Sequence, residues 1–159
     1  VSVCFGNESE FGALADSCGW SAAPAADPDA CVRAKTHGSK LATLLGGRRA
    51  AGGSIVVITH GANPAVVITA DGSDEPATTV QTFPARPIEP QSIVDTTGAG
   101  DSFAAGFLAS LVKQRCRRNC EVDVKACAEL GATASWHTLQ RSGFDLGSEN
   151  PAEEHVNRE

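Results

Sequence analysis

The sequence lacks methionine altogether and starts at Val1 within residues 1–5, an apolar run of the kind found in buried strands. Because a complete translation product begins with methionine or a processed end, we expect this chain of 159 residues to be a piece of a longer protein. It also lacks any apolar run near the about 20 residues that cross a bilayer, and it shows no signal-peptide pattern. We therefore expect no membrane partner and a cytoplasmic location.

The sequence has few basic residues, 13 against 19 acidic ones, and its formal net charge is −6. Nucleic-acid binding favours basic surfaces, so we expect no nucleic-acid partner. An anionic ligand would need a local positive field from helix ends, a metal ion and a few basic side chains.

The six cysteines include no C-x-x-C pair. Cys116 and Cys120 are four residues apart, but no matching His/Cys pair lies nearby, which argues against a zinc site. Cys4 and Cys127 lie in apolar stretches, and we interpret them as small core residues. The glycine-rich, basic connector at residues 46–53 lacks the G-x-x-x-x-G-K-[ST] order of a P-loop, so we interpret it as a surface loop.

Hydrophobic patterning predicts alternating strands and helices. We expect strands at residues 1–5, 54–59, 65–69 and 78–83, a strand ending at 91–94, and helices at 8–16, 29–45, 101–113 and 122–139. This alternation favours an α/β fold with a largely parallel sheet. The last helix carries small residues on one face, which permits close packing against a sheet or a ligand: Val124, Cys127, Ala128, Gly131, Ala132 and Ser135.

One stretch, residues 95–107, joins the expected strand at 91–94 to a helix through two glycines and an alanine. Such a turn presents unpaired amides at the positive end of a helix dipole and lets a phosphate approach the backbone. A carboxylate there, Asp101, would repel a phosphate unless it served as the base that accepts a hydroxyl proton. The alternative is that Asp101 only suits the helix dipole in the first turn.

A second candidate site lies at the junction of residues 1–5 with the first helix. Asn7 and Glu10 form an N-x-x-E pair there. Asn7 as the N-cap residue and Glu10 three residues later would also form a capping box, and by itself the spacing favours that structural role.

Three stretches resemble the PfkB family of carbohydrate and nucleoside kinases, and within it the adenosine kinases. They are D-T-T-G-A-G-D-S-F-A-A-G-F from residue 95 with the later Q-R-S-G from residue 140, F-G-N-E-S-E from residue 5, and I-V-V-I-T-H-G from residue 55. The resemblance covers a C-terminal portion. It implies a ribokinase-like, Rossmann-like three-layer sandwich with a mostly parallel sheet. It also implies transfer of the γ-phosphate of ATP to the 5′-hydroxyl of adenosine, giving AMP in purine salvage.

The resemblance also implies roles for single residues. Asp101 is the base, and the amides of Gly98, Ala99 and Gly100 form the anion hole for the transferring phosphoryl group. Phosphoryl transfer depends mostly on positioning and charge neutralisation, so amides, a metal and one base suffice for it.

For the nucleotide, the resemblance implies that Asn7 and Glu10 hold the phosphates and Mg²⁺ through water. Thr59 and Gly61 line the ATP site. The family's monovalent-cation loop, a place for K⁺, falls on three residues: Asp95, Thr97 and Arg141.

The sequence departs from the family pattern in places. Thr97 stands where many adenosine kinases carry Asn, and A-G-F at 105–107 replaces the usual G-G-F, which leaves the adenine contacts open. We expect residues 1–147 to form the nucleotide-binding and catalytic part and residues 148–159 a polar tail. A sugar kinase of the ribokinase or fructokinase type and a non-catalytic nucleotide-binding remnant stay as alternatives.

Overall fold

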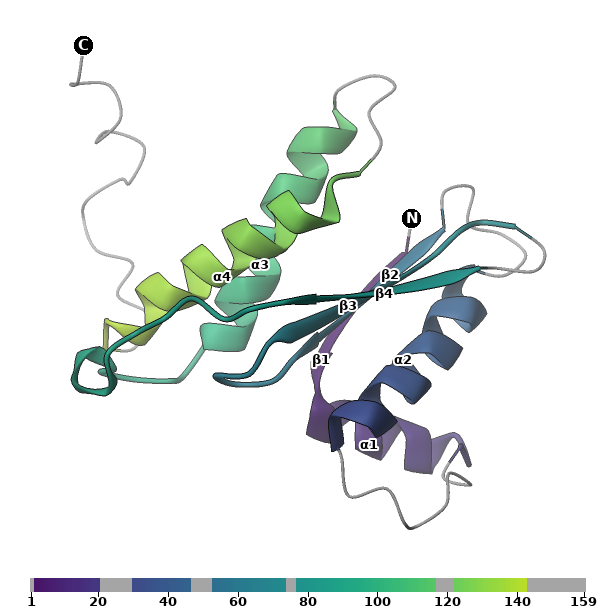
Figure 1. Cartoon of the computed structure of the whole chain (residues 1–159), viewed down its shortest axis with the longest axis horizontal. Helices are drawn as coiled ribbons and strands as arrows, with labels where there is room; N and C mark the ends of the chain where they lie inside the picture. Colours follow the sequence, from purple (N-terminus) through teal and green to yellow (C-terminus); the bar gives the residue numbers. More distant parts are fainter. Residues whose placement is uncertain (1, 21–29, 47–52, 74–76, 117–121, 143–159) are drawn as a thin grey trace.

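The computed structural model describes residues 2–20, 30–46, 53–73, 77–116 and 122–142 (Figure 1). Its elements in chain order are β1 (Ser2–Asn7), α1 (Glu8–Ser17), α2 (Ala30–Gly46), β2 (Ser54–Thr59), β3 (Ala65–Ala70), β4 (Thr78–Phe83), the 3₁₀ turn η1 (Pro90–Ser92), α3 (Ala99–Arg115) and α4 (Val124–Leu139). The expected tail at 148–159 and most of the connector at 46–53 lie outside the described residues.

The four strands form one mixed sheet in the order β1-β2-β3-β4. Strands β1 and β2 are parallel, while β2–β3 and β3–β4 are antiparallel, so the prediction of a mostly parallel sheet is wrong. The reason is loop length: residues 60–64 and 71–77 are too short for the crossover of about a dozen residues that a parallel pair needs. Only the β1–β2 connection contains helices, α1 and α2.

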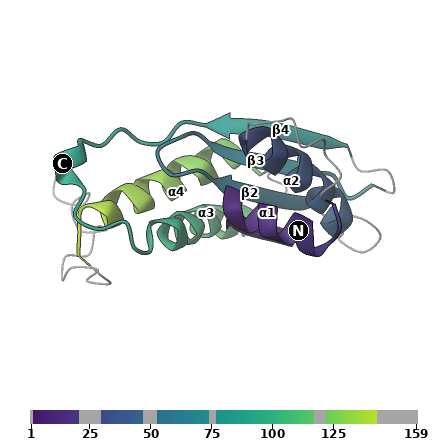
Figure 2. The same cartoon turned by 90° about the horizontal axis from the view of Figure 1, so that it is seen from below.

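The sheet is covered on both faces, which gives three layers (Figures 1 and 2). In β2, Ile55 and Val57 face α3 and α4, whereas Val56 and Ile58 face α1 and α2. Alternate residues of a strand point to opposite faces, so a continuous apolar run such as Ser54–Thr59 suits a strand buried on both sides. On the α3 side, the ring of Phe107 is fully buried within the first of these cores.

Two helices approach their neighbours so closely that a Cβ added at one of their glycines would force the neighbour to shift. A Cβ on Gly38 of α2 would lie 2.6 Å from the Cδ1 atom of Ile68 in the sheet. A Cβ on Gly106 of α3 would lie 2.7 Å from the carbonyl oxygen of Leu130 on α4. Gly131 makes the reciprocal approach to α3, so the small-residue face expected on α4 does pack closely.

The strand expected at 91–94 is absent. Residues 90–92 form η1, and Ile93 and Val94 are 38% and 62% exposed. The amides of Val94 and Asp95 both donate to the carbonyl oxygen of Leu139 at the end of α4, at 2.8 and 3.4 Å. A helix terminus, rather than a neighbouring strand, therefore satisfies this backbone, and the nearby prolines remove further donors.

The cysteines agree with the expected core positions: Cys127 is fully buried and Cys4 is half-buried. Cys116 is exposed at the end of α3, and Cys120 lies outside the described residues. Within the described ranges, no helix is both long and apolar enough to pass through a bilayer.

Candidate functional site

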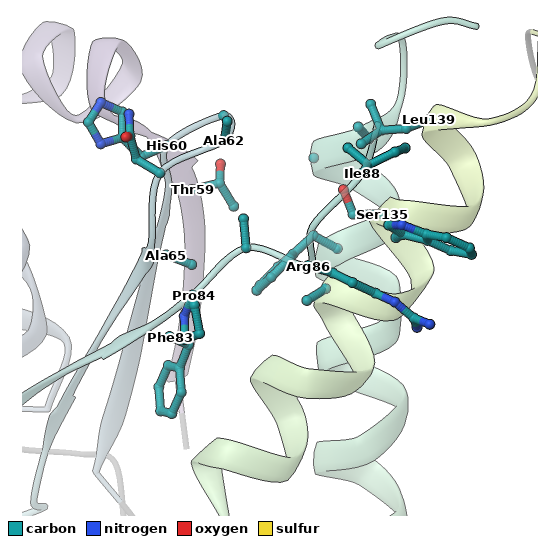
Figure 3. A pocket seen from close by; sticks show the side chains of 18 of the residues that line it. Thr59, His60, Ala62, Ala65, Phe83, Pro84, Arg86, Ile88, Ser135 and Leu139 are labelled. Carbon is teal, nitrogen blue, oxygen red and sulfur yellow. The ribbon is translucent and has the colours of Figure 1, made fainter. Parts of the chain in front are cut away.

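A cavity of about 700 Å³ lies between the β2–β3 turn, residues 84–88 and the helices α3 and α4 (Figure 3). Five of the residues predicted from the sequence line it: Asn7, Thr59, Gly61, Ala99 and Gly100. The other predicted residues lie outside its lining: Gly98, Asp101, Glu10, Asp95, Thr97 and Arg141. The fold thus brings Asn7, the β2–β3 turn and part of the glycine turn to one cavity.

The glycine turn is held in shape by its own residues. Gly98 has a φ of +76°, a left-handed conformation that L side chains rarely adopt. The carboxylate of Asp95 accepts the amide of Thr97 at 2.9 Å, and the amide of Ala99 donates to the carbonyl of Thr96 at 3.3 Å. Of the three amides proposed for the anion hole, that of Ala99 is therefore partly engaged within the turn.

Helix α3 begins without a side-chain cap. Of the three α-helices whose N-termini are described, α1 is capped by Asn7 and α4 by Asp123, whereas the N-cap residue of α3, Gly98, offers no side-chain acceptor. The first amides of a helix have no intrahelical partner. A Cβ on Gly100 would meet nothing within 4 Å, so the start of α3 is open toward an anion.

Asp101 follows Gly100 in the first turn of α3 and is exposed. Among the described residues, its carboxylate takes part in no hydrogen bond or ion pair. This placement agrees with both predicted roles of Asp101: a carboxylate that only favours the helix dipole, and a catalytic base beside the cavity.

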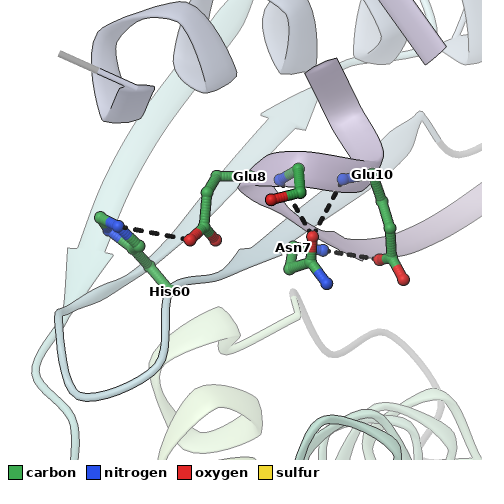
Figure 4. A network of polar contacts seen from close by, with 5 residues as sticks. Asn7, Glu8, Glu10 and His60 are labelled. Atoms are coloured by element: carbon green, nitrogen blue, oxygen red, sulfur yellow. Dashed lines mark hydrogen bonds and ion pairs between the residues drawn. The ribbon is translucent and has the colours of Figure 1, made fainter. Parts of the chain in front are cut away.

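Asn7 and Glu10 form the capping box of α1 (Figure 4). The Oδ1 atom of Asn7 accepts the amides of Ser9 and Glu10 at 3.0 and 2.9 Å, and the Oε2 atom of Glu10 accepts the amide of Asn7 at 2.8 Å. The structural alternative for this pair is thus realised. The side-chain amide nitrogen of Asn7 and the second oxygen of Glu10 have no part in it.

The residues present fit a metal only through water. The described part of the chain contains no group of three or more His, Cys, Asp or Glu side chains that could hold a metal ion. Mg²⁺ in phosphate sites keeps several waters and uses one or two carboxylates, so Glu10 alone would suit a water-mediated ion.

The β2–β3 turn adds a histidine that the sequence did not single out. His60 lines the cavity, and its Nε2 atom lies 3.6 Å from the Oε1 atom of Glu8 (Figure 4). The other oxygen of Glu8 is buried and has no hydrogen-bond partner among the described residues. The turn is therefore tied to the first residue of α1.

The end of α4 positions the glycine turn. Besides the Leu139 carbonyl that accepts the amides of Val94 and Asp95, the hydroxyl of Thr138 donates to that of Ser102 on α3 at 2.7 Å. The segment carrying Asp95 and Thr97 thus lies against the helix end that precedes Arg141. The role of these three residues toward K⁺ stays a prediction.

Residues of α4 and of the segment after β4 also line the cavity. Ala128, Ala132 and Ser135 belong to the small-residue face of α4, where a ligand was one of the expected neighbours. Arg86 and Trp136 also line the cavity, but they are far apart in the chain and no local pattern marks either of them.

Comparison with known protein families identifies residues 1–151 as matching the description "pfkB family carbohydrate kinase". This chain belongs to the pfkB family. Its relatives include adenosine kinase 2 of Arabidopsis thaliana, which is 39% identical over 87 residues, 55% of this chain and 21% of the relative. The adenosine kinase of Saccharomyces cerevisiae is 34% identical over 94 residues, 59% of this chain and 24% of the relative. A cytidine kinase of Thermococcus kodakarensis is 38% identical over 92 residues, 58% of this chain and 28% of the relative.

Solved structures of family members share the fold. Adenosine kinase of Anopheles gambiae in complex with P1,P4-di(adenosine-5) tetraphosphate matches 90% of this chain and 36% of its own, with a TM-score of 0.65 and 34% identity. Adenosine kinase of Schistosoma mansoni with 2-fluoroadenosine matches 92% of this chain and 37% of its own, with a TM-score of 0.66 and 29% identity. The pfkB chain described here thus spans well under half the length of these relatives.

Proposed function

We propose that this chain carries the ATP site and catalytic base of a kinase that transfers the γ-phosphate of ATP to the 5′-hydroxyl of adenosine, giving AMP in purine salvage. One observation carries the proposal: a single cavity is bordered by Gly100 on α3, Asn7 at the end of β1 and Gly61 after β2. Each of these residues belongs to one of the three stretches that resemble adenosine kinases. The adenosine and cytidine kinases among the relatives support a nucleoside acceptor.

The phosphates lie at the start of α3. The amides of Gly98, Ala99 and Gly100 face the transferring phosphoryl group, and the dipole of the helix favours its negative charge. The uncapped N-terminus and the open space at Gly100 support this placement. On a chain of net charge −6, this is a local positive field for an anionic ligand.

The adenine of ATP lies in the apolar part of the cavity. Residues 84–88 form one side of it, and Ala128 and Ala132 of α4 form the other. Ligand cavities are mostly apolar with a few polar groups that fix orientation, and here Thr59 and Ser135 supply hydroxyls.

Asp101 accepts the proton of the acceptor hydroxyl. As that proton leaves, the 5′-oxygen forms its bond to the γ-phosphorus, and the bond from phosphorus to the β–γ bridging oxygen breaks. ADP leaves with the electron pair. The exposed carboxylate, one residue beyond the amides at Gly100, is free to meet an acceptor held outside the cavity.

Two ions belong to the proposal. Glu10 and Asn7 would hold Mg²⁺ through water, and the ion would supply charge neutralisation on the phosphates. Asp95, Thr97 and Arg141 would hold K⁺ beside the glycine turn. Because Glu10 also caps α1, its second oxygen is the one that faces the ion's water shell.

The test is calorimetric titration of the chain with a non-hydrolysable ATP analogue in the presence of Mg²⁺. Gly100→Val places a branched side chain where the phosphate would approach, and we expect affinity to fall at least about 10-fold. Gly12→Val on α1 is the matched control, because a Cβ there also meets nothing within 4 Å and Gly12 lies outside the cavity lining. Equal affinity of the Gly100 and Gly12 variants would show that the phosphates do not lie on this turn.

A further inference from the structure

The wall of the cavity formed by residues 84–88 has little backbone support of its own. It follows β4 and precedes η1, without regular secondary structure. Pro84 and Pro87 have no amide hydrogen to donate. Among the described residues, the backbone of 84–88 makes no hydrogen bond to another backbone group. Side chains of α4 must therefore hold this wall.

Two side chains do so. The Nε1 atom of Trp136 donates to the carbonyl oxygen of Pro87 at 3.0 Å. The guanidinium of Arg86 lies over the Trp136 ring, with 4.3 Å from its central carbon to the ring centroid, and its Nη1 atom reaches the hydroxyl of Thr133 at 3.5 Å. Arg86 and Trp136 both line the cavity, and their cation–π contact joins the segment at residues 84–88 to α4.

The position of this pair matters more than its strength. Its contacts join residues 84–88 to α4, and neither side chain belongs to the glycine turn or to the end of β1, on which the phosphates are placed. The indole is an apolar, rigid plane whose N–H finds a partner, and a cation over such a plane adds attraction. The pair fixes the distance between the two walls, and its side-chain hydrogen bonds among the described residues go to Pro87 and Thr133.

We propose that Arg86 and Trp136 are positioning residues of the nucleotide site, which hold the base-binding wall at residues 84–88 against α4. This inference rests on the proposed function. It assigns them to binding of the base and not of the phosphates, so loss of either side chain weakens a nucleotide and spares a ligand made of phosphates alone.

The experiment compares ADP with inorganic tripolyphosphate, each titrated calorimetrically into the chain with Mg²⁺. For Trp136→Leu and Arg86→Leu we expect ADP to bind at least about 10-fold more weakly, with tripolyphosphate unchanged within about twofold. Arg86→Lys keeps a cation over the ring and should restore most of the ADP affinity. Trp136→Phe keeps the ring and loses the bond to Pro87, so its affinity should lie between those of the wild type and Trp136→Leu.

The chain offers a matched control in a second cation–π pair. The Nζ atom of Lys40 lies 5.0 Å from the centroid of the Trp20 ring, and neither residue lines the cavity. Lys40→Leu should leave both affinities unchanged. In a Trp20→Phe background, Trp136 is the single indole, and we expect ADP to change its fluorescence more than tripolyphosphate does.

The possible failures are distinguishable. If the wild type binds neither ligand, the proposed function fails and this inference falls with it. If the wild type binds ADP but Trp136→Leu and Arg86→Leu bind it equally well, only the positioning role is overturned. If the variants lose affinity for ADP and for tripolyphosphate to the same extent, the pair serves general stability and the positioning role is overturned. A lower thermal midpoint in Trp136→Phe as well as in the leucine variants would lead to the same conclusion.

Discussion

Single residues at this site serve the fold and the ligand at once. Asn7 and Glu10 complete a capping box, which removes the need for any other explanation of their spacing, yet Asn7 also lines the cavity. The positive φ at position 98 favours glycine there, whereas at Gly100 φ is not positive and a Cβ would meet nothing within 4 Å. At the residue scale, the fold therefore constrains Gly100 less than Gly98, and Asp101 has no hydrogen-bond or ion-pair partner among the described residues.

Asp101 can be tested by removing its charge. In the full-length protein, Asp101→Asn should leave ATP binding nearly intact and lower kcat at least about 100-fold, because general-base catalysis contributes on that scale. Steady-state kinetics and calorimetry on the same preparation measure both quantities. Asp16→Asn, an exposed aspartate of α1, is the control, and turnover of Asp101→Asn within a few-fold of it would rule out the base assignment.

Cysteine reactivity should separate the core from the surface. Burial raises the pKa of the Cys127 thiol, and the nearby Asp123 carboxylate acts in the same direction. The thiolate is the reactive form, so at pH 8 we expect iodoacetamide to modify the exposed Cys18 and Cys116 quickly and Cys127 only after denaturant is added. Mass spectrometry of labelled peptides measures each rate.

The same shift has a consequence for stability. The pKa of Cys127 is raised in the folded state, so the protonated thiol contributes to the free energy of unfolding. This contribution is complete below the pKa of an unfolded cysteine, about 8.5, and is lost as the pH rises from there through the pKa of the folded state. Fast labelling of Cys127 in the native protein would contradict its place in the core.

At the element scale, glycines of α1 and α2 differ in the space around them. A Cβ on Gly38 of α2 would lie 2.6 Å from the Cδ1 atom of Ile68 and 3.0 Å from that of Ile58, whereas a Cβ on Gly12 of α1 would meet nothing within 4 Å. Glycine inside a helix is unfavourable, and the close packing of α2 on the sheet offsets this cost at Gly38.

Replacing each of these glycines by alanine should have opposite effects. We expect Gly38→Ala to lower the free energy of unfolding by about 1–3 kcal/mol through overpacking against the sheet. Gly12→Ala should raise it by up to about 1 kcal/mol, because alanine favours the helix and nothing obstructs its methyl group. Urea unfolding followed by circular dichroism measures both, and equal effects of the two changes would show that α2 is not held so close.

At the scale of the whole molecule, the chain corresponds to only part of its relatives. The cavity, the glycine turn and Asp101 are present, and the chain matches 36% of the length of the Anopheles gambiae enzyme. Strand β1 pairs with β2 and, among the described residues, with no other strand. An open sheet edge of this kind favours association.

We therefore predict that residues 1–159 bind nucleotide weakly and do not phosphorylate adenosine by themselves. Without groups that hold the acceptor hydroxyl near Asp101, the reaction loses a proximity contribution that reaches about 7–11 kcal/mol in the best cases. Water also weakens the charge interactions in an open site. A coupled assay of ADP release, with adenosine and with ribose, measures this.

The assay is then repeated after adding, as a separate polypeptide, the remaining part of a related adenosine kinase. Turnover restored only by this addition supports the division between an ATP side and an acceptor side. Rapid adenosine-dependent turnover by the chain alone would show that its acceptor site lies within these residues.

The sequence by itself determined most of the helices and strands, because these depend on neighbours in the chain. The continuous apolar run at 54–59, the N-x-x-E spacing and the glycines before Asp101 are local signals. The four α-helices and the four strands of the sheet formed where such signals placed them. Short turns between β2, β3 and β4 were also visible, yet the α/β alternation outweighed them and led to the wrong expectation of a mostly parallel sheet.

Tertiary structure alone decided which segments, distant in the sequence, lie side by side. Residues 91–94 did not form a strand, because Ser92 and Ile93 donate their amides within the 3₁₀ turn and Val94 donates its amide to the carbonyl of Leu139 at the end of α4. Arg86 and Trp136, which are far apart in sequence, came into contact across two walls of the cavity. A local pattern cannot encode such pairings, because they depend on how the sheet places β4 beside α4, and that follows from packing the two cores on its opposite faces.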